Sequence, residues 1–331
     1  MIMIMGVLLM TNLTLKQAYD LFIFDRETFC SPKTIVYYQK NIGFFIDYVR
    51  IFDVMLLSEL SSIPENVLSR YVHHLRDKVR FSNHPFAVKD DDIKIKNTTI
   101  RTYSRAVKAF LNFCNLEYGT SFITKVRMPK DDSDEKVPLY NDEVKQIDKL
   151  FNLKTETGLR NYCLFHLMLD AGLRAEEVQA LLVSHIFFDK NIIKIVDSKG
   201  NKSRIVILAP KLKKYLFTYL TLYCGYRIGS SSHQFVFKKM RGDGAINYNC
   251  IKMVFTRIKK ASGITRLTPH LLRHTFATSY IMGGGNIESL RLLLGHYDYS
   301  VTRTYLHLAN SLALMKADIY KLDSSFFNFG Y

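Results

Sequence analysis

The sequence predicts a mainly α-helical protein of two domains, with one small antiparallel sheet in the second domain. Its 331 residues exceed the ~100–200 residues of one typical domain. Apolar side chains recur at three- and four-residue intervals through most of the chain, and this spacing indicates amphipathic helices. Two short β-branched runs joined by a polar turn depart from this pattern and predict a single β-hairpin.

Four helices make up the expected first domain, which we place at residues 12–128. Thr14 precedes the first apolar stretch, and at Ser31 and Pro32 a good N-cap is followed by proline at the first helical position. We expect these helices at residues 15–29, 31–48, 64–80 and 97–114. Their Tyr and Phe stripes are interpreted as core rather than as a platform on which bases stack.

A charged segment at residues 129–140 separates the two expected domains. It begins with Pro129, continues past Pro138 and contains no apolar run, which suits a flexible tether. We place the second domain at residues 141–310, an N-terminal extension at residues 1–11 and a C-terminal tail at residues 311–331.

The second domain is expected to combine helices with the hairpin. Gly172 is interpreted as a helix stop, and the two strands are joined by Asp-Ser-Lys-Gly-Asn-Lys-Ser. We expect helices at residues 141–151, 159–170 and 247–261, further helices from there to the end of the chain, and strands at residues 191–196 and 204–208.

The chain is strongly basic, with 46 Lys and Arg against 30 Asp and Glu and a formal net charge of +16. Residues 141–331 hold 27 of these basic and 14 of these acidic side chains, so most of the surplus belongs to the second domain. Such a balance is typical of proteins that face nucleic acid, an anionic membrane or an acidic partner.

The apolar segment Met1–Met10 does not favour a membrane. It is shorter than the ~20 residues that a span needs, and it lacks the basic region and cleavage site of a signal peptide. We interpret it as an extension, or as the product of a start codon placed too early. The five cysteines are scattered and form no C-x-x-C, which indicates reduced thiols rather than a disulfide framework or zinc ribbon. We expect no membrane partner and a cytoplasmic location.

The most informative stretch reads Leu-Thr-Pro-His-Leu-Leu-Arg-His from residue 267. Thr268 and Pro269 indicate an N-cap and the first residue of a helix. His270, Arg273 and His274 then fall at i, i+3 and i+4 and share one helix face. A cationic face near a helix N-terminus favours an anion, and a guanidinium can bind two phosphate oxygens at once.

A metal site is the alternative interpretation of these histidines. His270 and His274, with the later His296, could be three zinc ligands. The zinc-binding pattern H-E-x-x-H needs glutamate where this chain has Leu271, and Arg273 would repel a dication. We therefore expect no metal and no other cofactor.

Further residues complete a constellation whose order along the chain is informative. Arg174 lies in Ala-Gly-Leu-Arg-Ala-Glu-Glu, and Lys199 lies in the hairpin turn. His296 follows Leu-Gly, and Tyr305 follows Ser300, a candidate helix cap. Each is unremarkable alone in a chain with 20 Tyr and 46 basic residues. The order Arg, Lys, His-x-x-Arg, His, Tyr is what carries information.

In this order the sequence resembles the tyrosine recombinase family, also called the phage integrase family, and most closely its bacterial Xer-like branch. The resemblance covers nearly all of residues 12–310 and is most specific from 172 to 308. Six residues match the family's active site, and none is substituted: Arg174, Lys199 (with Lys202 as an alternative in the same loop), His270, Arg273, His296 and Tyr305. The resemblance implies a helical, SAM-like core-binding domain followed by a mixed α/β catalytic domain.

The resemblance also implies a role for each of these residues. Tyr305 would attack a phosphodiester and leave a 3′-phosphotyrosyl link that conserves the bond energy for rejoining. Because the reference pKa of a phenol is ~10, this nucleophile needs a base, which would be His270. Arg174 and Arg273 would hold the non-bridging oxygens, Lys199 would protonate the departing 5′ oxygen, and His296 would hydrogen-bond the phosphate.

The expected function is therefore a site-specific DNA recombinase that needs neither metal nor high-energy cofactor. The expected partners are double-stranded DNA with specific recombination sites and three further protomers, in a tetramer on two sites, and the protein would be associated with the nucleoid. Glu177 would brace the site, and His274 would orient or pack. We expect Phe326, Phe327 and Phe329 to dock the C-terminal tail on a neighbouring protomer.

Two alternatives remain open at the level of sequence. A type IB topoisomerase or a telomere resolvase would use the same chemistry, but the Xer-like layout without long insertions argues against both. A DNA-binding regulator with an inactive site belongs to a different class of function. Loss of any of the six matched residues would have favoured it, and all six are present.

Overall fold

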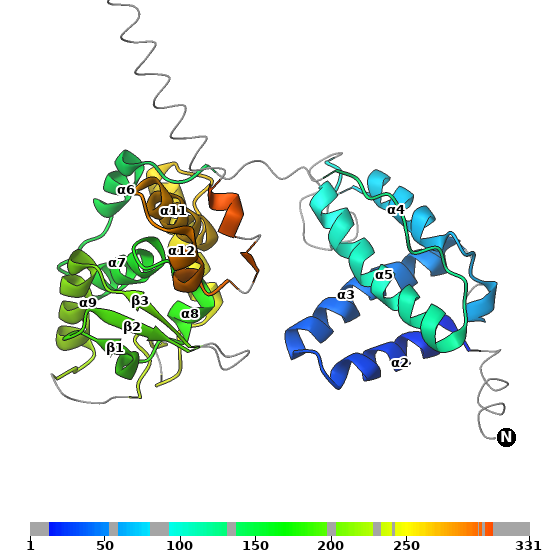
Figure 1. Cartoon of the computed structure of the whole chain (residues 1–331), viewed down its shortest axis with the longest axis horizontal. Coiled ribbons are helices and arrows are strands. Elements are labelled where there is room, and N and C mark those ends of the chain that lie inside the picture. Colours follow the sequence, from blue (N-terminus) through cyan, green and yellow to red (C-terminus); the bar gives the residue numbers. More distant parts are fainter. Residues whose placement is uncertain are drawn as a thin grey trace, which may run out of the picture. The chain divides into compact units, whose positions relative to one another are not determined.

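The computed structural model describes residues 13–52, 59–79, 93–130, 137–196, 203–227, 233–239, 242–296, 298–299 and 302–306 (Figure 1). The chain divides into two compact units, Met1–Glu135 and Lys136–Tyr331, and the division falls inside residues 129–140. Both units are mostly helical, and the second holds one three-stranded antiparallel sheet. The predicted fold class is confirmed, whereas the expected N-terminal extension and C-terminal tail lie outside the described residues.

The described residues of the first unit form four α-helices and one short 3₁₀ turn. The bounds are α2 (Leu15–Glu27), α3 (Pro32–Phe52), η2 (Leu60–Ser62), α4 (Val67–Asp77) and α5 (Asn97–Tyr118). Helix α5 packs against the other three helices. Aromatic side chains fill the centre, where the ring of Phe22 meets that of Phe110 edge-on at 5.5 Å. The Tyr and Phe stripes therefore supply core, as the sequence predicted.

Helix boundaries in the first unit follow local capping chemistry. Thr14 accepts a hydrogen bond from the backbone of Gln17, whose side chain reaches back to the Thr14 amide, so both ends of a capping box are present. The third helix was expected from residue 64 but begins at Val67. Pro64 instead accepts a turn hydrogen bond from the Val67 amide, and this turn delays the helix.

The second unit places helices around a small sheet. The bounds are α6 (Asn141–Asp148), α7 (Glu156–Leu169), α8 (Ala175–Gln179), η3 (Val183–His185), β1 (Ile186–Phe187), β2 (Ile192–Ile195), β3 (Arg204–Ile207), α9 (Pro210–Tyr223), α10 (Tyr248–Ser262), α11 (Pro269–Met282) and α12 (Ile287–Leu294). Residues 302–306 are also helical. Helix α7 is buried without interruption from Tyr162 to Leu169 and packs against α9 and α11, so it forms the centre of this unit.

The predicted hairpin is present as β2 and β3, which pair antiparallel. Ile193 faces Val206 on the buried side, and Ile195 pairs with Arg204 at the end that leads to the hairpin turn. The third strand, β1, was not expected because it is only two residues long. Helix α9 was also missed, although Pro210 at its first turn and buried leucines at four-residue spacing signal it.

No helix in the described part of the chain is long and apolar enough to cross a membrane.

A buried histidine links three helices of the second unit. Both ring nitrogens of His166, on α7, lie 2.8 Å from carboxylates, Nδ1 from Asp170 and Nε2 from Asp148 of α6. Lys211 of α9 approaches the second Asp148 oxygen at 2.9 Å. A neutral imidazole has one N–H, so two carboxylate partners require the charged form. Burial alone would lower the pKa of His166, but the two carboxylates outweigh it and raise the pKa.

Replacing His166 should therefore weaken the fold in a pH-dependent way. Because the folded-state pKa is raised, the stabilisation is complete below the ordinary histidine pKa of ~6.5 and is lost as the pH rises through the folded value. We expect His166→Asn to lower the free energy of unfolding by about 3 kcal/mol near pH 6. The deficit should shrink at higher pH in urea denaturation. His73→Asn, at a side chain that is 81% exposed, should change stability by less than ~0.5 kcal/mol. A pH-independent deficit at His166 would contradict the charged pair.

Candidate active site

Arg174 and Glu177 lie at the start of α8 and form an ion pair with each other. The backbone N–H of Arg174 donates to Glu177 Oε2 at 2.7 Å, and Arg174 Nη1 donates to Oε1 at 2.9 Å. The carboxylate thus caps the helix start and orients the guanidinium. The Arg174 side chain is still 42% exposed, so a ligand can reach it from solvent.

Arg273 comes from the second turn of α11 and points into the protein. Its side chain is 3% exposed. Nη1 donates to the Gly172 carbonyl at 2.6 Å, and Nη2 donates to the Leu294 carbonyl at 2.5 Å. Burial and then repulsion by Arg174 lower the pKa of Arg273 to about 9, so the group stays charged at neutral pH. An anion placed beside these two guanidiniums would relieve their repulsion.

His296 lies just beyond α12 and takes its protonation state from its neighbours. Arg273 Nη2 lies 3.1 Å from His296 Nε2, and Thr302 Oγ1 lies 3.0 Å from Nδ1. Because a guanidinium can only donate, Nε2 must accept, and the single proton belongs on Nδ1. Burial and the charges of Arg273 and Arg174 lower the pKa of His296 to about 4, which agrees with a neutral ring.

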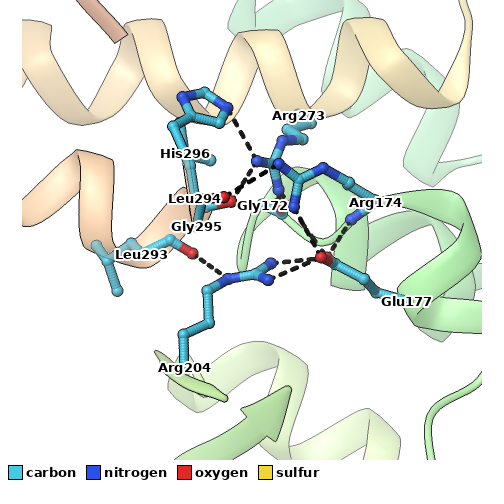
Figure 2. A network of polar contacts seen from close by, with 9 residues as sticks. All are labelled: Gly172, Arg174, Glu177, Arg204, Arg273, Leu293, Leu294, Gly295 and His296. Carbon is cyan, nitrogen blue, oxygen red and sulfur yellow. Dashed lines mark hydrogen bonds and ion pairs between the residues drawn. The ribbon is translucent and has the colours of Figure 1, made fainter. Parts of the chain in front are cut away.

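Three consecutive carbonyls at the end of α12 each accept from a different arginine (Figure 2). Besides the Leu294 bond to Arg273, Leu293 accepts from Arg204 Nε at 2.6 Å and Gly295 accepts from Arg174 Nη2 at 3.4 Å. The free carbonyls and the negative dipole end make a helix C-terminus a natural place for cations. This helix end therefore gathers the guanidiniums into one cluster.

Glu177 is the carboxylate that all three guanidiniums share. Arg204 binds it through two parallel hydrogen bonds of 2.7 and 2.6 Å, and Arg273 Nη1 lies 4.0 Å from Oε2. Burial would raise the pKa of Glu177, but the arginine contacts, led by Arg204, lower it to about 2. The carboxylate is thus ionised at neutral pH, and three guanidiniums against one carboxylate leave these contacting groups with a net positive charge.

Tyr305 lies on the helical segment 302–306 and is 6% exposed. Its ring is nearly parallel to that of His296, with centroids 6.2 Å apart, and the His274 ring lies 5.2 Å away on a tilt. Burial raises the pKa of the Tyr305 hydroxyl, while Arg273 and Arg174 oppose this shift. The arginine cluster is thus electrostatically coupled to the tyrosine, whose proton still has to be removed before it can attack.

The structure brings five of the six predicted residues to one region, and the sixth lies outside the described residues. His270 is exposed on the first turn of α11, and a positive charge on it would lower the pKa of His296. Lys199 and its alternative Lys202 lie outside the described residues. His274, predicted to orient or pack, is half-buried against the ring of Tyr305.

Within the described residues no group of three or more His, Cys, Asp and Glu side chains could hold a metal ion.

A comparison with known families decides the identity of this fold and site. The model of the phage integrase family matches residues 138–311. The chain belongs to the phage integrase family. The match takes in α6 to α12 and the segment that carries Tyr305, so it covers every element described above for the site.

Curated phage integrase relatives extend the likeness to most of the chain. It is 27% identical to the tyrosine recombinase XerC of Bacillus pumilus over 294 residues, which cover 82% of this chain and 92% of that protein. It is 30% identical to the tyrosine recombinase XerA of Saccharolobus solfataricus over 278 residues, 83% of this chain and 82% of that one. The chain is thus a tyrosine recombinase of the Xer-like type, an enzyme that transfers DNA strands.

Solved structures show the same fold. The Tn1549 transposon integrase in complex with a circular intermediate DNA matches with a TM-score of 0.69 at 16% sequence identity. The match covers 88% of this chain and 94% of that one. The predicted recognition, fold class and enzyme class are confirmed.

Arg204 is the residue of this phage integrase site that sequence reasoning missed. The β-branched pattern predicts only that a strand begins at this residue. The available signal was the alternation of β3, which puts Arg204 on the same side as the buried Val206. A charged side chain on the inward face of a strand needs a partner, and Glu177 supplies it.

The close packing behind Arg273 predicts a strong effect at Gly172. Its φ is +67°, and an added Cβ would lie 2.5 Å from Phe276 Cδ1. We expect Gly172→Ala to lower the free energy of unfolding by about 3 kcal/mol, from backbone strain together with overpacking. Gly263→Ala is the matched control, because its φ is +74° and nothing lies within 4 Å of the added atom. It should cost about 1 kcal/mol. Equal losses in thermal denaturation would show that the Phe276 contact is harmless.

Proposed function

We propose that this chain cuts one DNA strand at a specific site with Tyr305, holds the end as a 3′-phosphotyrosyl link, and rejoins it to another strand. The observation that carries the proposal is a buried tyrosine packed against His296 and electrostatically coupled to Arg273 and Arg174, two of the three guanidiniums that share one carboxylate. Attack on a phosphodiester needs a nucleophile and compensation of the growing negative charge. Tyr305 supplies the nucleophile, and the guanidiniums supply the positive charge.

Arg174 and Arg273 are the proposed ligands of the scissile phosphate. Arg174 is accessible, and its 3.4 Å contact with Gly295 is the longest hydrogen bond in the cluster, so a phosphate oxygen can replace it. Arg273 is fixed from behind by Gly172 and Leu294. Donors already fixed in place need no rearrangement as charge develops in the transition state, which makes them effective.

The proton transfers are assigned to three further residues. His270 is the proposed base for the Tyr305 hydroxyl, because it is exposed on the same helix as Arg273. Lys199 is the proposed acid for the departing 5′ oxygen. His296 is neutral without DNA, and a phosphate anion would raise its pKa and take over the Nη2 hydrogen bond that Nε2 now accepts, while Gly172 and Leu294 keep the Arg273 guanidinium in place. His296 could then donate from Nε2 to the phosphate.

Double-stranded DNA with specific recombination sites is the proposed partner of both units. The Tn1549 integrase, which shares the fold, was solved with DNA. The second unit carries most of the positive surplus, which suits contact with the phosphate backbone. The first unit, proposed as residues 12–128, would be the core-binding domain, and residues 129–140 the tether. We further propose a tetramer on two DNA sites, held in part by the tail at residues 311–331.

The nucleophile can be tested with Tyr305→Phe on a nicked suicide substrate that traps the covalent adduct. The variant should bind DNA like the wild type and form no adduct, because it lacks the attacking oxygen. Tyr299→Phe, at an exposed tyrosine six residues earlier, is the control and should form the adduct normally. An adduct with Tyr305→Phe would show that another residue attacks.

The role of the tail can be tested by truncation after Leu322. This removes Phe326, Phe327 and Phe329. We expect cleavage of a single site to persist while assembly of the four-protomer complex on paired sites is lost. Native gels and strand-exchange assays measure both. Unchanged assembly and strand exchange would rule out docking in trans.

A further inference from the structure

Arg204 joins three elements of the site with its whole guanidinium group. It is the first residue of β3, and it pairs with Ile195 at the point where the segment carrying Lys199 is attached to the sheet. Its Nη1 and Nη2 donate to both oxygens of Glu177 on α8. Its Nε donates to the Leu293 carbonyl at the end of α12. The hairpin, α8 and α12 are thus held by one side chain.

The geometry gives Arg204 a different task from the other two arginines. Its side chain is 12% exposed, against 42% for Arg174, and its contacts already occupy Nε, Nη1 and Nη2. Packing is tight there too, since a Cβ added at Gly295 would lie 3.0 Å from Arg204 Cδ. Arg204 is therefore committed to both oxygens of Glu177 and to the end of α12, whereas Arg174 gives Glu177 one side-chain nitrogen and stays open to solvent.

We propose that Arg204 is a positioning residue for DNA cleavage, which acts by fixing Glu177, and through it Arg174, against the end of α12. This proposal rests on the proposed function of Arg174 as a phosphate ligand. Glu177 receives Arg204 on one side and both the amide and the guanidinium of Arg174 on the other. Arg204 thus sets where the carboxylate lies, and the carboxylate sets where Arg174 points.

Stability alone is a weak explanation for this ion pair. A buried ion pair often contributes little net stability, because removing two charges from water offsets their attraction. The effect of the ion pair on the cleavage rate can be much larger, because a displacement of ~1 Å at a reacting centre can lower a rate by ~100-fold. The same unit contains a matched pair for comparison. Arg266 binds Glu143 through two hydrogen bonds of 2.7 and 2.6 Å, and Arg266 is 37% exposed.

The test compares Arg204→Lys with Arg266→Lys. Each variant keeps the positive charge and loses the bidentate hydrogen bonds to a glutamate. We measure melting temperature, the Kd for a duplex that carries the site, and the rate of covalent adduct formation at saturating suicide substrate. Arg204→Lys should keep its Kd within about twofold and lose about 10- to 100-fold in the cleavage rate. Arg266→Lys should keep both.

A double-variant cycle separates positioning from general damage. Glu177→Gln alone should slow cleavage about as much as Arg204→Lys, and the combined variant should be little slower than either, because both act on the same orientation of Arg174. Additive losses would overturn the proposal. So would a normal cleavage rate in Arg204→Lys, or equal slowing in Arg266→Lys.

Two outcomes distinguish this inference from the proposed function. If the wild-type protein forms no adduct, the proposed function fails. If the wild type forms the adduct and Arg204→Lys forms it equally fast, only the positioning role fails.

If Arg204→Lys melts at a much lower temperature than the wild type, Arg204→Met at the same position tests whether the cleavage defect follows the loss of stability. A cleavage defect that disappears in a stably folded Arg204→Met would also overturn the proposal.

Discussion

The end of helix α12 is the feature on which the catalytic region depends. Its last carbonyls, at Leu293, Leu294 and Gly295, face three arginines that come from a strand, a helix and a helix start. Like charges gathered this closely repel one another, and a helix C-terminus is one of few backbone features that attract cations. The three arginines can therefore lie together before any DNA is present.

Glu177 completes this arrangement without cancelling it. One carboxylate shared by three guanidiniums orients them and leaves a net positive charge. The lowered pKa values of Arg273 and His296 have the same origin, burial beside other cations. A phosphate entering the site would favour the charged form of both groups. In the proposed mechanism, the same electrostatic attraction would bind the phosphate and bring both groups to their charged forms.

The sequence predicted the elements whose signals are local. Thr268 and Pro269 predicted the start of α11, and Gly172 predicted the end of α7. The five described residues proposed for the site could be nominated from their order along the chain. The role of Arg204 could not be found in this way, because its partners Glu177 and Leu293 are 27 and 89 residues away. The buried ion pairs of His166 were missed for the same reason, since Asp148 lies 18 residues before it.

The central claim is that Tyr305 attacks a phosphate held by this cluster. It is tested most directly by mass spectrometry of the covalent adduct after protease and nuclease digestion. We expect one modified peptide, beginning after Arg303, with the nucleotide attached to Tyr305 through its 3′ phosphate. A link to any other residue, or through a 5′ phosphate, would contradict it.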